Sequence, residues 1–83
     1  MITVKLVGHI RTEVGIDELG LEDEELDPPA LINRLRSMCK EPGFNEFNTL
    51  LMVEDSEAFV PAGSSKKLKG GDRVVVIPFS HGG

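Results

Sequence analysis

Apolar and polar residues alternate over the first segment of the chain. The apolar members, at every second position, are Ile2, Val4 and Leu6. A period of two is typical of a β-strand with one buried face, so the pattern predicts a strand over residues 2–6. A weaker alternation predicts a second strand over residues 16–21; its apolar members are Ile16, Leu19 and Leu21. Residues 8–15 have a glycine at each end and are mostly polar between, so we expect a hairpin with a long loop.

A helix is predicted over residues 28–40, "PPALINRLRSMCK". Asp27 can cap its first turn, and Pro28 suits the first helical position, where no partner for the backbone N–H is needed. The side chains expected on its apolar side are Leu31, Leu35 and Met38, with Ile32 and Cys39 beside them. The proline and glycine of residues 41–43, "EPG", are expected to end the helix.

Three later segments predict further strands: a buried strand at 49–54, a short edge strand at 58–61 that ends at a proline, and a last strand at 73–79. Residues 44–48, "FNEFN", are compatible with a short helical turn. The order is typical of an α+β fold with a mixed sheet of four or five strands and one main helix on one face. The ubiquitin-like β-grasp has this order, with its first and last strands parallel and adjacent. We expect one such domain over residues 1–83, with 80–83 as a flexible C-terminal tail.

Size and charge exclude several classes of function. A chain of 83 residues is too short to enclose a deep catalytic cavity beside its core, which disfavours an enzyme. The net charge of −5 argues against nucleic acid or an anionic membrane as partner, because both select clustered positive charge. A single cysteine excludes an internal disulfide. Because no signal peptide precedes the first predicted strand, a cytoplasmic location is expected.

The C-terminal segment, "LKGGDRVVVIPFSHGG", carries the most specific signal. It resembles the end of the small subunit of molybdopterin synthase and its relatives, the ubiquitin-like sulfur carriers. The matching positions are Leu68, Gly71, Asp72, Val74, Val76, Pro78, Gly82 and Gly83. Two positions depart from that pattern: Phe79 stands where many such carriers have a second proline, and the ending "HGG" is closer to the ubiquitin-related modifiers. The departures concern the pathway and not the fold.

The resemblance implies a chemistry centred on Gly83. A ubiquitin-activating-type partner would use ATP to adenylate the Gly83 carboxylate, and a sulfur donor would convert it to a thiocarboxylate. Gly82 and Gly83 are the residues implied to react or to admit the partner, since neither carries a side chain that blocks the carbonyl. The protein would then be a cosubstrate rather than an enzyme, with no stably bound cofactor or metal. The implied second partner is a sulfur-acceptor enzyme such as a molybdopterin synthase large subunit.

A docking surface is predicted next to this tail. If Val74 and Val76 face the helix, alternation places Val75, Ile77 and Phe79 on the open face of the sheet as an apolar stripe. Such stripes commonly mark interfaces. The residues expected to contact a partner are Val75, Ile77, Pro78, Phe79, Ser80 and His81. The alternative is that residues 44–48 or the edge strand cover the stripe, which would make it part of the core.

Other functions and residues are weighed against this hypothesis. One alternative is a ubiquitin-like modifier whose activated Gly83 is attacked by a lysine; another is a β-grasp interaction module with an inert tail. The sulfur acceptor is left open among a molybdopterin precursor, tRNA, thiazole and a cysteine precursor. Cys39 is expected to pack as a small hydrophobe, and His9 and His81 are too far apart in sequence to predict a metal site.

Overall fold

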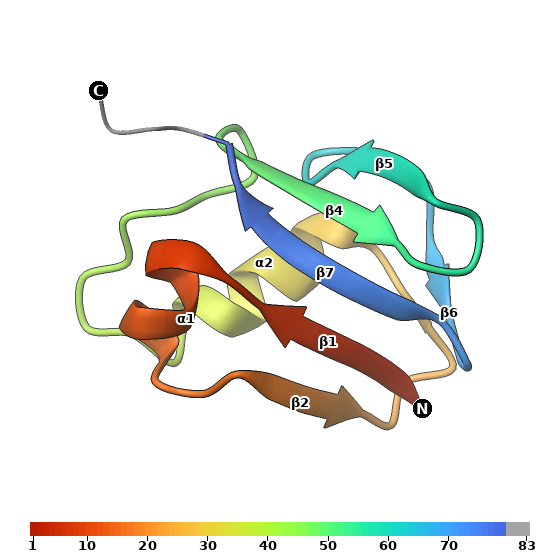
Figure 1. The fold of residues 1–83 in the computed structure, drawn as a ribbon, viewed down its shortest axis with the longest axis horizontal. Helices are drawn as coiled ribbons and strands as arrows, with labels where there is room; N and C mark the ends of the chain where they lie inside the picture. The colour runs from red at the N-terminus through yellow and green to blue at the C-terminus, as the bar shows by residue number, and fades with distance from the viewer. Residues whose placement is uncertain (80–83) are drawn as a thin grey trace.

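The computed structural model describes residues 1–79, and the fold follows from the pairing of strands in this part of the chain (Figure 1). Here a five-stranded mixed sheet has the order β2-β1-β7-β4-β5. Its strands, in chain order, are β1 (Ile2–Leu6), β2 (Glu18–Leu21), β4 (Thr49–Val53), β5 (Ala58–Pro61) and β7 (Arg73–Pro78). A short second ladder joins β3 (Glu25–Leu26) to β6 (Leu68–Lys69).

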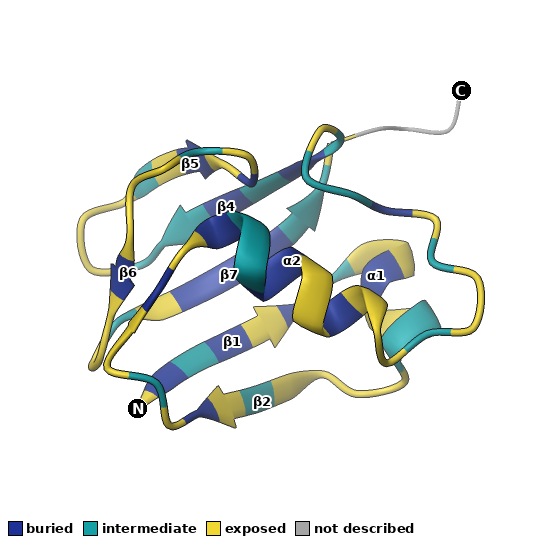
Figure 2. Ribbon diagram, turned by 180° about the vertical axis from the view of Figure 1, so that it is seen from behind, coloured by how far each residue is buried: buried dark blue, intermediate teal, exposed yellow. Residues whose placement is uncertain are grey.

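The first and last strands pair in parallel at the centre of the sheet, with Val4 beside Val74 and Leu6 beside Val76. β7 also pairs antiparallel with β4, so it is hydrogen-bonded on both sides. Helix α2 (Pro28–Arg36) covers one face of the sheet (Figure 2), and no helix of residues 1–79 lies over the other face, which is seen in Figure 1. The arrangement is a β-grasp-like α+β fold, which confirms the predicted fold class.

The core lies between the sheet and α2. Alternate residues of β1 and β7 point into it: Val4, Val74 and Val76 are at most 1% exposed. The helix contributes Leu31, Ile32 and Leu35, all equally buried. At roughly 1.5–3 kcal/mol for each fully buried aliphatic side chain, this layer is the main stabilising contribution in the domain.

Helix α2 is shorter than the sequence predicts. It begins after Asp27, as predicted, but it ends at Arg36 rather than at Lys40. The Ser37 hydroxyl donates a hydrogen bond to the Arg34 carbonyl oxygen at 2.6 Å. The backbone N–H groups of Met38 and Cys39 then donate to carbonyl oxygens three residues earlier in the chain, instead of four. This tight turn ends the helix before "EPG" is reached. Met38, predicted on the apolar side, is 46% exposed, whereas Cys39 packs against the core.

The predicted loop at residues 8–15 is wrong in its detail, because it contains helix α1 (Gly8–Val14). Ile10 is fully buried in the core and Val14 packs beside it, at the i, i+4 spacing of one helical face. Gly15 ends the helix in the left-handed conformation, with its N–H donating to the Arg11 carbonyl oxygen. β1 and β2 pair antiparallel as predicted, but β2 starts at Glu18, and Ile16 is 37% exposed.

Three ion pairs connect the acidic segment before α2, residues 22–27, to Arg34 and Lys67. Arg34 Nη1 lies 2.7 Å from Asp23 Oδ1, and this guanidinium lowers the pKa of the Asp23 carboxyl. Lys67 Nζ lies 3.7 Å from both Glu25 and Asp27. Neither helix in residues 1–79 is long and apolar enough to cross a membrane.

Candidate functional site

The candidate site is the end of β7, where the central strand leads into the diglycine segment. Pro78 is the last residue of the strand and lies beside Thr49 of β4. The Phe79 N–H then donates to the Asn48 carbonyl oxygen at 2.8 Å, which extends the pairing with this edge by one residue. Four of the predicted site residues, Ser80, His81, Gly82 and Gly83, lie outside the described residues. We call the segment Ile77–Phe79 the root of the tail.

The register places the predicted stripe on the open face of the sheet. Val74 and Val76 face the core, so Val75 and Ile77 point the other way, as predicted. Their exposure differs along the stripe: Val75 is only 8% exposed, Ile77 and Pro78 are half-buried, and Phe79 is 64% exposed. Val75 is less exposed than Ile77 and Phe79 because it lies between Lys5 of β1 and Met52 of β4 on the two neighbouring strands. The surface available to a partner is therefore concentrated at the root.

The apolar surface is also wider than the stripe. Met52 of β4 lies beside Val75, and Phe59 of β5 lies beside Met52 in the next register position. Leu50 lies beside Ile77 in the same way. Phe59 is 62% exposed, so the edge strand does not close over this face. Sequence reasoning missed Leu50 and Met52 because the segment "TLLMV" is apolar at consecutive positions, which hides the face that each side chain takes.

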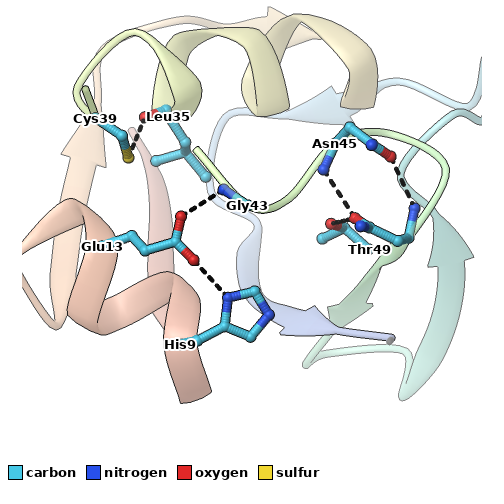
Figure 3. A network of polar contacts seen from close by, with 8 residues as sticks. His9, Glu13, Leu35, Cys39, Gly43, Asn45 and Thr49 are labelled. Atoms are coloured by element: carbon cyan, nitrogen blue, oxygen red, sulfur yellow. Dashed lines mark hydrogen bonds and ion pairs between the residues drawn. The ribbon is translucent and has the colours of Figure 1, made fainter. Parts of the chain in front are cut away.

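Residues 44–48 form a folded loop beside the root instead of covering the stripe. Asn45 Oδ1 accepts hydrogen bonds from the Phe47 and Asn48 N–H groups at 2.7 and 3.1 Å. In return, Asn48 Oδ1 accepts from the Asn45 N–H at 2.8 Å and from the buried Thr49 hydroxyl at 3.1 Å (Figure 3). Phe44 anchors the loop in the core, while Phe47 is 85% exposed. The loop thus fixes the carbonyl that receives Phe79 N–H.

Helix α1 packs against the other side of the root. Gly8, at its first position, has a φ of 62°, which is unfavourable for residues with a side chain. A Cβ at Gly8 would lie 2.8 Å from Pro78 Cγ, closer than side-chain atoms pack. Glycine at this position is therefore needed both for the backbone conformation and for the close approach of α1 to β7.

Glu13 connects these two supports of the root. One carboxylate oxygen accepts from the Gly43 N–H at 2.5 Å and the other lies 2.6 Å from His9 Nδ1 (Figure 3). The hydrogen bond from Gly43, followed by that from His9, lowers the pKa of the Glu13 carboxyl. Because Glu13 belongs to α1 and Gly43 to the segment leading into residues 44–48, the carboxylate holds the helix and the loop together.

Cys39, the single cysteine of the chain, is partly buried just after the end of α2. Cys39 Sγ donates weakly to the Leu35 carbonyl oxygen at 3.5 Å, and burial, with the Glu13 carboxylate adding to it, raises the pKa of its thiol. A raised pKa leaves less of the nucleophilic thiolate at neutral pH. Within residues 1–79 no group of three or more His, Cys, Asp or Glu side chains is placed to hold a metal ion.

Comparisons of the chain with known protein families, with curated proteins and with solved structures found no match. The functional argument therefore depends on the fold, on the geometry of the root and on the sequence of the tail.

The contact between α1 and the root predicts a difference between two glycine substitutions. Gly8→Ala should destabilise the domain by about 1–2 kcal/mol for the left-handed backbone and by about 1–3 kcal/mol more for the clash with Pro78. Gly15→Ala is the matched control, because its φ is also positive but no atom lies within 4 Å of the added Cβ. Urea unfolding measures both. If both variants lose the same unfolding free energy, the contact between Gly8 and Pro78 does not limit the side chain at position 8. Adding Pro78→Ala to Gly8→Ala should restore part of the lost unfolding free energy, because it removes the atoms that clash.

The Glu13 contacts predict a dependence of stability on pH. Since folding lowers the pKa of this carboxyl, its stabilising contribution is complete above the ordinary value of about 4.3 and is lost as pH falls through that value and the lower native one. Glu13→Gln keeps the hydrogen-bonding shape without the charge. Between about pH 5 and pH 3 the variant should lose less unfolding free energy than the native protein. Glu41→Gln, at an exposed position, is the control; if it flattens the profile as much, the Glu13 assignment is wrong.

Proposed function

We propose that this protein is a ubiquitin-like sulfur carrier that works through the carboxylate of Gly83. What supports the proposal most is the position of β7: the strand leading into "SHGG" is the central strand of a β-grasp-like sheet, paired with β1 and β4. Such an anchor holds the root in one place while the residues beyond it enter a partner. The four residues after Phe79 span at most about 13–14 Å, which suits a narrow channel.

In this proposal the chemistry is supplied by partners. A ubiquitin-activating-type enzyme joins the Gly83 carboxylate to AMP and releases pyrophosphate from ATP. A donor that supplies sulfur as hydrosulfide then attacks the acyl carbon, the bond to AMP breaks, and a thiocarboxylate forms. The carrier delivers that sulfur to an acceptor enzyme, proposed to be a molybdopterin synthase large subunit in the formation of the molybdenum cofactor. The protein itself needs no general acid, base or bound cofactor, and we propose that it acts in the cytoplasm.

The proposed docking surface joins the root to the open face of the sheet. Phe79 is its most exposed described member, and Ile77 and Pro78 connect it to the apolar residues of β4 and β5. Exposed aromatic side chains next to enclosed aliphatic ones are typical of interface anchors. The net charge of −5 favours neutral or basic partner surfaces around this apolar centre.

The second candidate is a ubiquitin-like modifier, which the ending "SHGG" favours. Activation is the same in both cases, and the difference is the nucleophile that removes the acyl group. An amine acceptor must lose its proton first, and an unperturbed lysine has a pKa of about 10.4. The modifier therefore needs an additional enzyme or base to position and deprotonate the target lysine, whereas the carrier does not.

Intact mass of the native protein tests the proposal. After growth with ample sulfur, the protein purified from its host should be mainly unconjugated, end at Gly83, and include a fraction in which one sulfur replaces one oxygen. Covalent adducts that survive reducing denaturation, with Gly-Gly remnants on target lysines, would instead establish the modifier. A native chain that continues past Gly83 and is never processed there would exclude both.

A matched variant with one alanine added after Gly83 serves as the control. It should fold as stably as the native protein, because a residue at this end contributes little to the core. It should nevertheless not support ATP–pyrophosphate exchange by the activating enzyme. Unchanged exchange would refute a role for the Gly83 carboxylate.

The docking surface gives a separate prediction. Phe79→Asp should weaken binding to the activating enzyme at least about tenfold, which corresponds to about 1.4 kcal/mol. Because Phe79 is 64% exposed, the unfolding free energy should change by no more than about 0.5 kcal/mol. Met38→Asp introduces the same charge at an exposed apolar residue on the helix side and should leave affinity unchanged. If both variants bind alike by titration calorimetry, the root is not part of the interface.

A further inference from the structure

A pocket of about 210 Å³ lies away from the root, among β4, β5 and β6. Its apolar wall is formed by Val53, Val60 and Leu68. Val60 and Leu68 belong to the buried core, and Val53 packs against it, so the pocket opens directly onto the flank of the core. Figure 1 shows β6 near the start of β7, at the opposite end of that strand from Pro78. The pocket is therefore separate from the site proposed above.

Three lysines, Lys66, Lys67 and Lys69, also line the pocket. Lys67 is partly neutralised, because its Nζ lies 3.7 Å from Glu25 and from Asp27. Lys66 and Lys69 are exposed and form no ion pair within residues 1–79. Two ammonium groups are thus available at the edge of an apolar hollow, in a chain whose net charge is −5. Exposed lysines can turn their ammonium groups toward a bound anion while their stems stay on apolar surface.

Nearby carboxylates limit how much negative charge the pocket can accept. Asp72 is part of its wall, and Asp72 Oδ2 accepts a hydrogen bond from the Lys69 backbone N–H at 2.8 Å. Asp55 and Glu57 flank Ser56, which also lines the pocket. A polyphosphate or a strongly acidic peptide would be repelled by these groups more strongly than a ligand that carries a single negative charge. The volume is also below the roughly 300–1,000 Å³ of pockets for drug-sized ligands.

We propose that this pocket binds one carboxylate carried on a small aliphatic body, with the body against Val53, Val60 and Leu68 and the carboxylate at Lys66 and Lys69. A chain of about five carbon atoms beyond the carboxyl group suits a site of this size. Two sources share this chemistry: a free short-chain carboxylic acid, and the C-terminal residue of a peptide that ends in a leucine-like side chain. The proposal does not depend on sulfur transfer, because the pocket and the root lie at different ends of β7.

The test is a titration of the full ¹⁵N-labelled chain, followed by amide chemical shifts at low ionic strength. Hexanoate should give saturable shifts at Val53, Ser56, Val60 and Leu68, with a Kd of about 1–10 mM. Hexylammonium, which has the same chain length and the opposite charge, should give none. The tetrapeptide Gly-Gly-Ser-Leu, compared as free acid and as amide, identifies the source: tighter binding of the free-acid peptide assigns a peptide end, and tighter binding of hexanoate assigns a free acid.

Two sets of variants test whether Lys66 and Lys69 bind the acid directly or whether the acid responds only to the overall positive charge of the protein. The double change Lys66→Gln and Lys69→Gln should weaken binding of the preferred acid at least about fivefold. Lys40→Gln removes one exposed positive charge elsewhere and should change the Kd by less than about twofold. The proposal is overturned if hexylammonium produces the same shifts, if neither acid saturates below about 50 mM, or if Lys40→Gln weakens binding as much as the double change. The titration contains only the protein and the added ligand, so its outcome does not depend on whether the proposed sulfur-carrier function is correct.

Discussion

The parallel pairing of β1 with β7 is the constraint on which the rest of the structure depends. Joining Val4 to Val74 closes a loop of about 70 residues, which costs about 4 kcal/mol of chain entropy by the logarithmic rule. The buried side chains that meet in these two strands offset that cost, at roughly 1.5–3 kcal/mol each. In the sheet, β2 and β4 pair with the two outer sides of this strand pair, and α2 covers the face that these valines form. The centre of the sheet is thus made from the two ends of the described chain.

The end of β7 is held by contacts that come from three separate parts of the sequence. Gly8 of α1 packs on Pro78, Asn48 receives the Phe79 N–H, and Glu13 joins α1 to the segment at Gly43. The two hydrogen bonds contribute modestly, since a neutral one is worth about 0.5–1.5 kcal/mol net and one to a charged group about 1.5–3 kcal/mol. Their effect is geometric: they define where the strand stops and leave Phe79 exposed at that point. A carrier or a modifier would need such a fixed starting point for its tail.

The sequence predicts most of the sheet because one buried face leaves a period of two, as in Ile2, Val4 and Leu6. It does not predict α1, since a helix of seven residues with a single fully buried side chain, Ile10, leaves no periodic stripe. The predicted end of α2 at Lys40 is wrong, because the chain already leaves the helix at Ser37 in a turn of three-residue hydrogen bonds, before the stop signals at residues 41–43. The sequence does not predict that Leu50 and Met52 lie on the open face of the sheet, because residues 50–53 are all apolar and show no alternation. The pocket depends on side chains from β4, β5 and β6, which only the folded chain brings together.

The two ends of β7 present different chemistry, and this follows from the fold. At the Arg73 end, the β6–β7 turn places lysines beside the flank of the core, so the surface combines positive charge with an apolar hollow. At the Pro78 end, Gly8 of α1 packs on the strand, and Phe47 and Phe79 are exposed, so large apolar side chains are accessible there. A rigid central strand separates them by about 17 Å over its six residues. The two surfaces are therefore joined by one strand that is hydrogen-bonded on both sides.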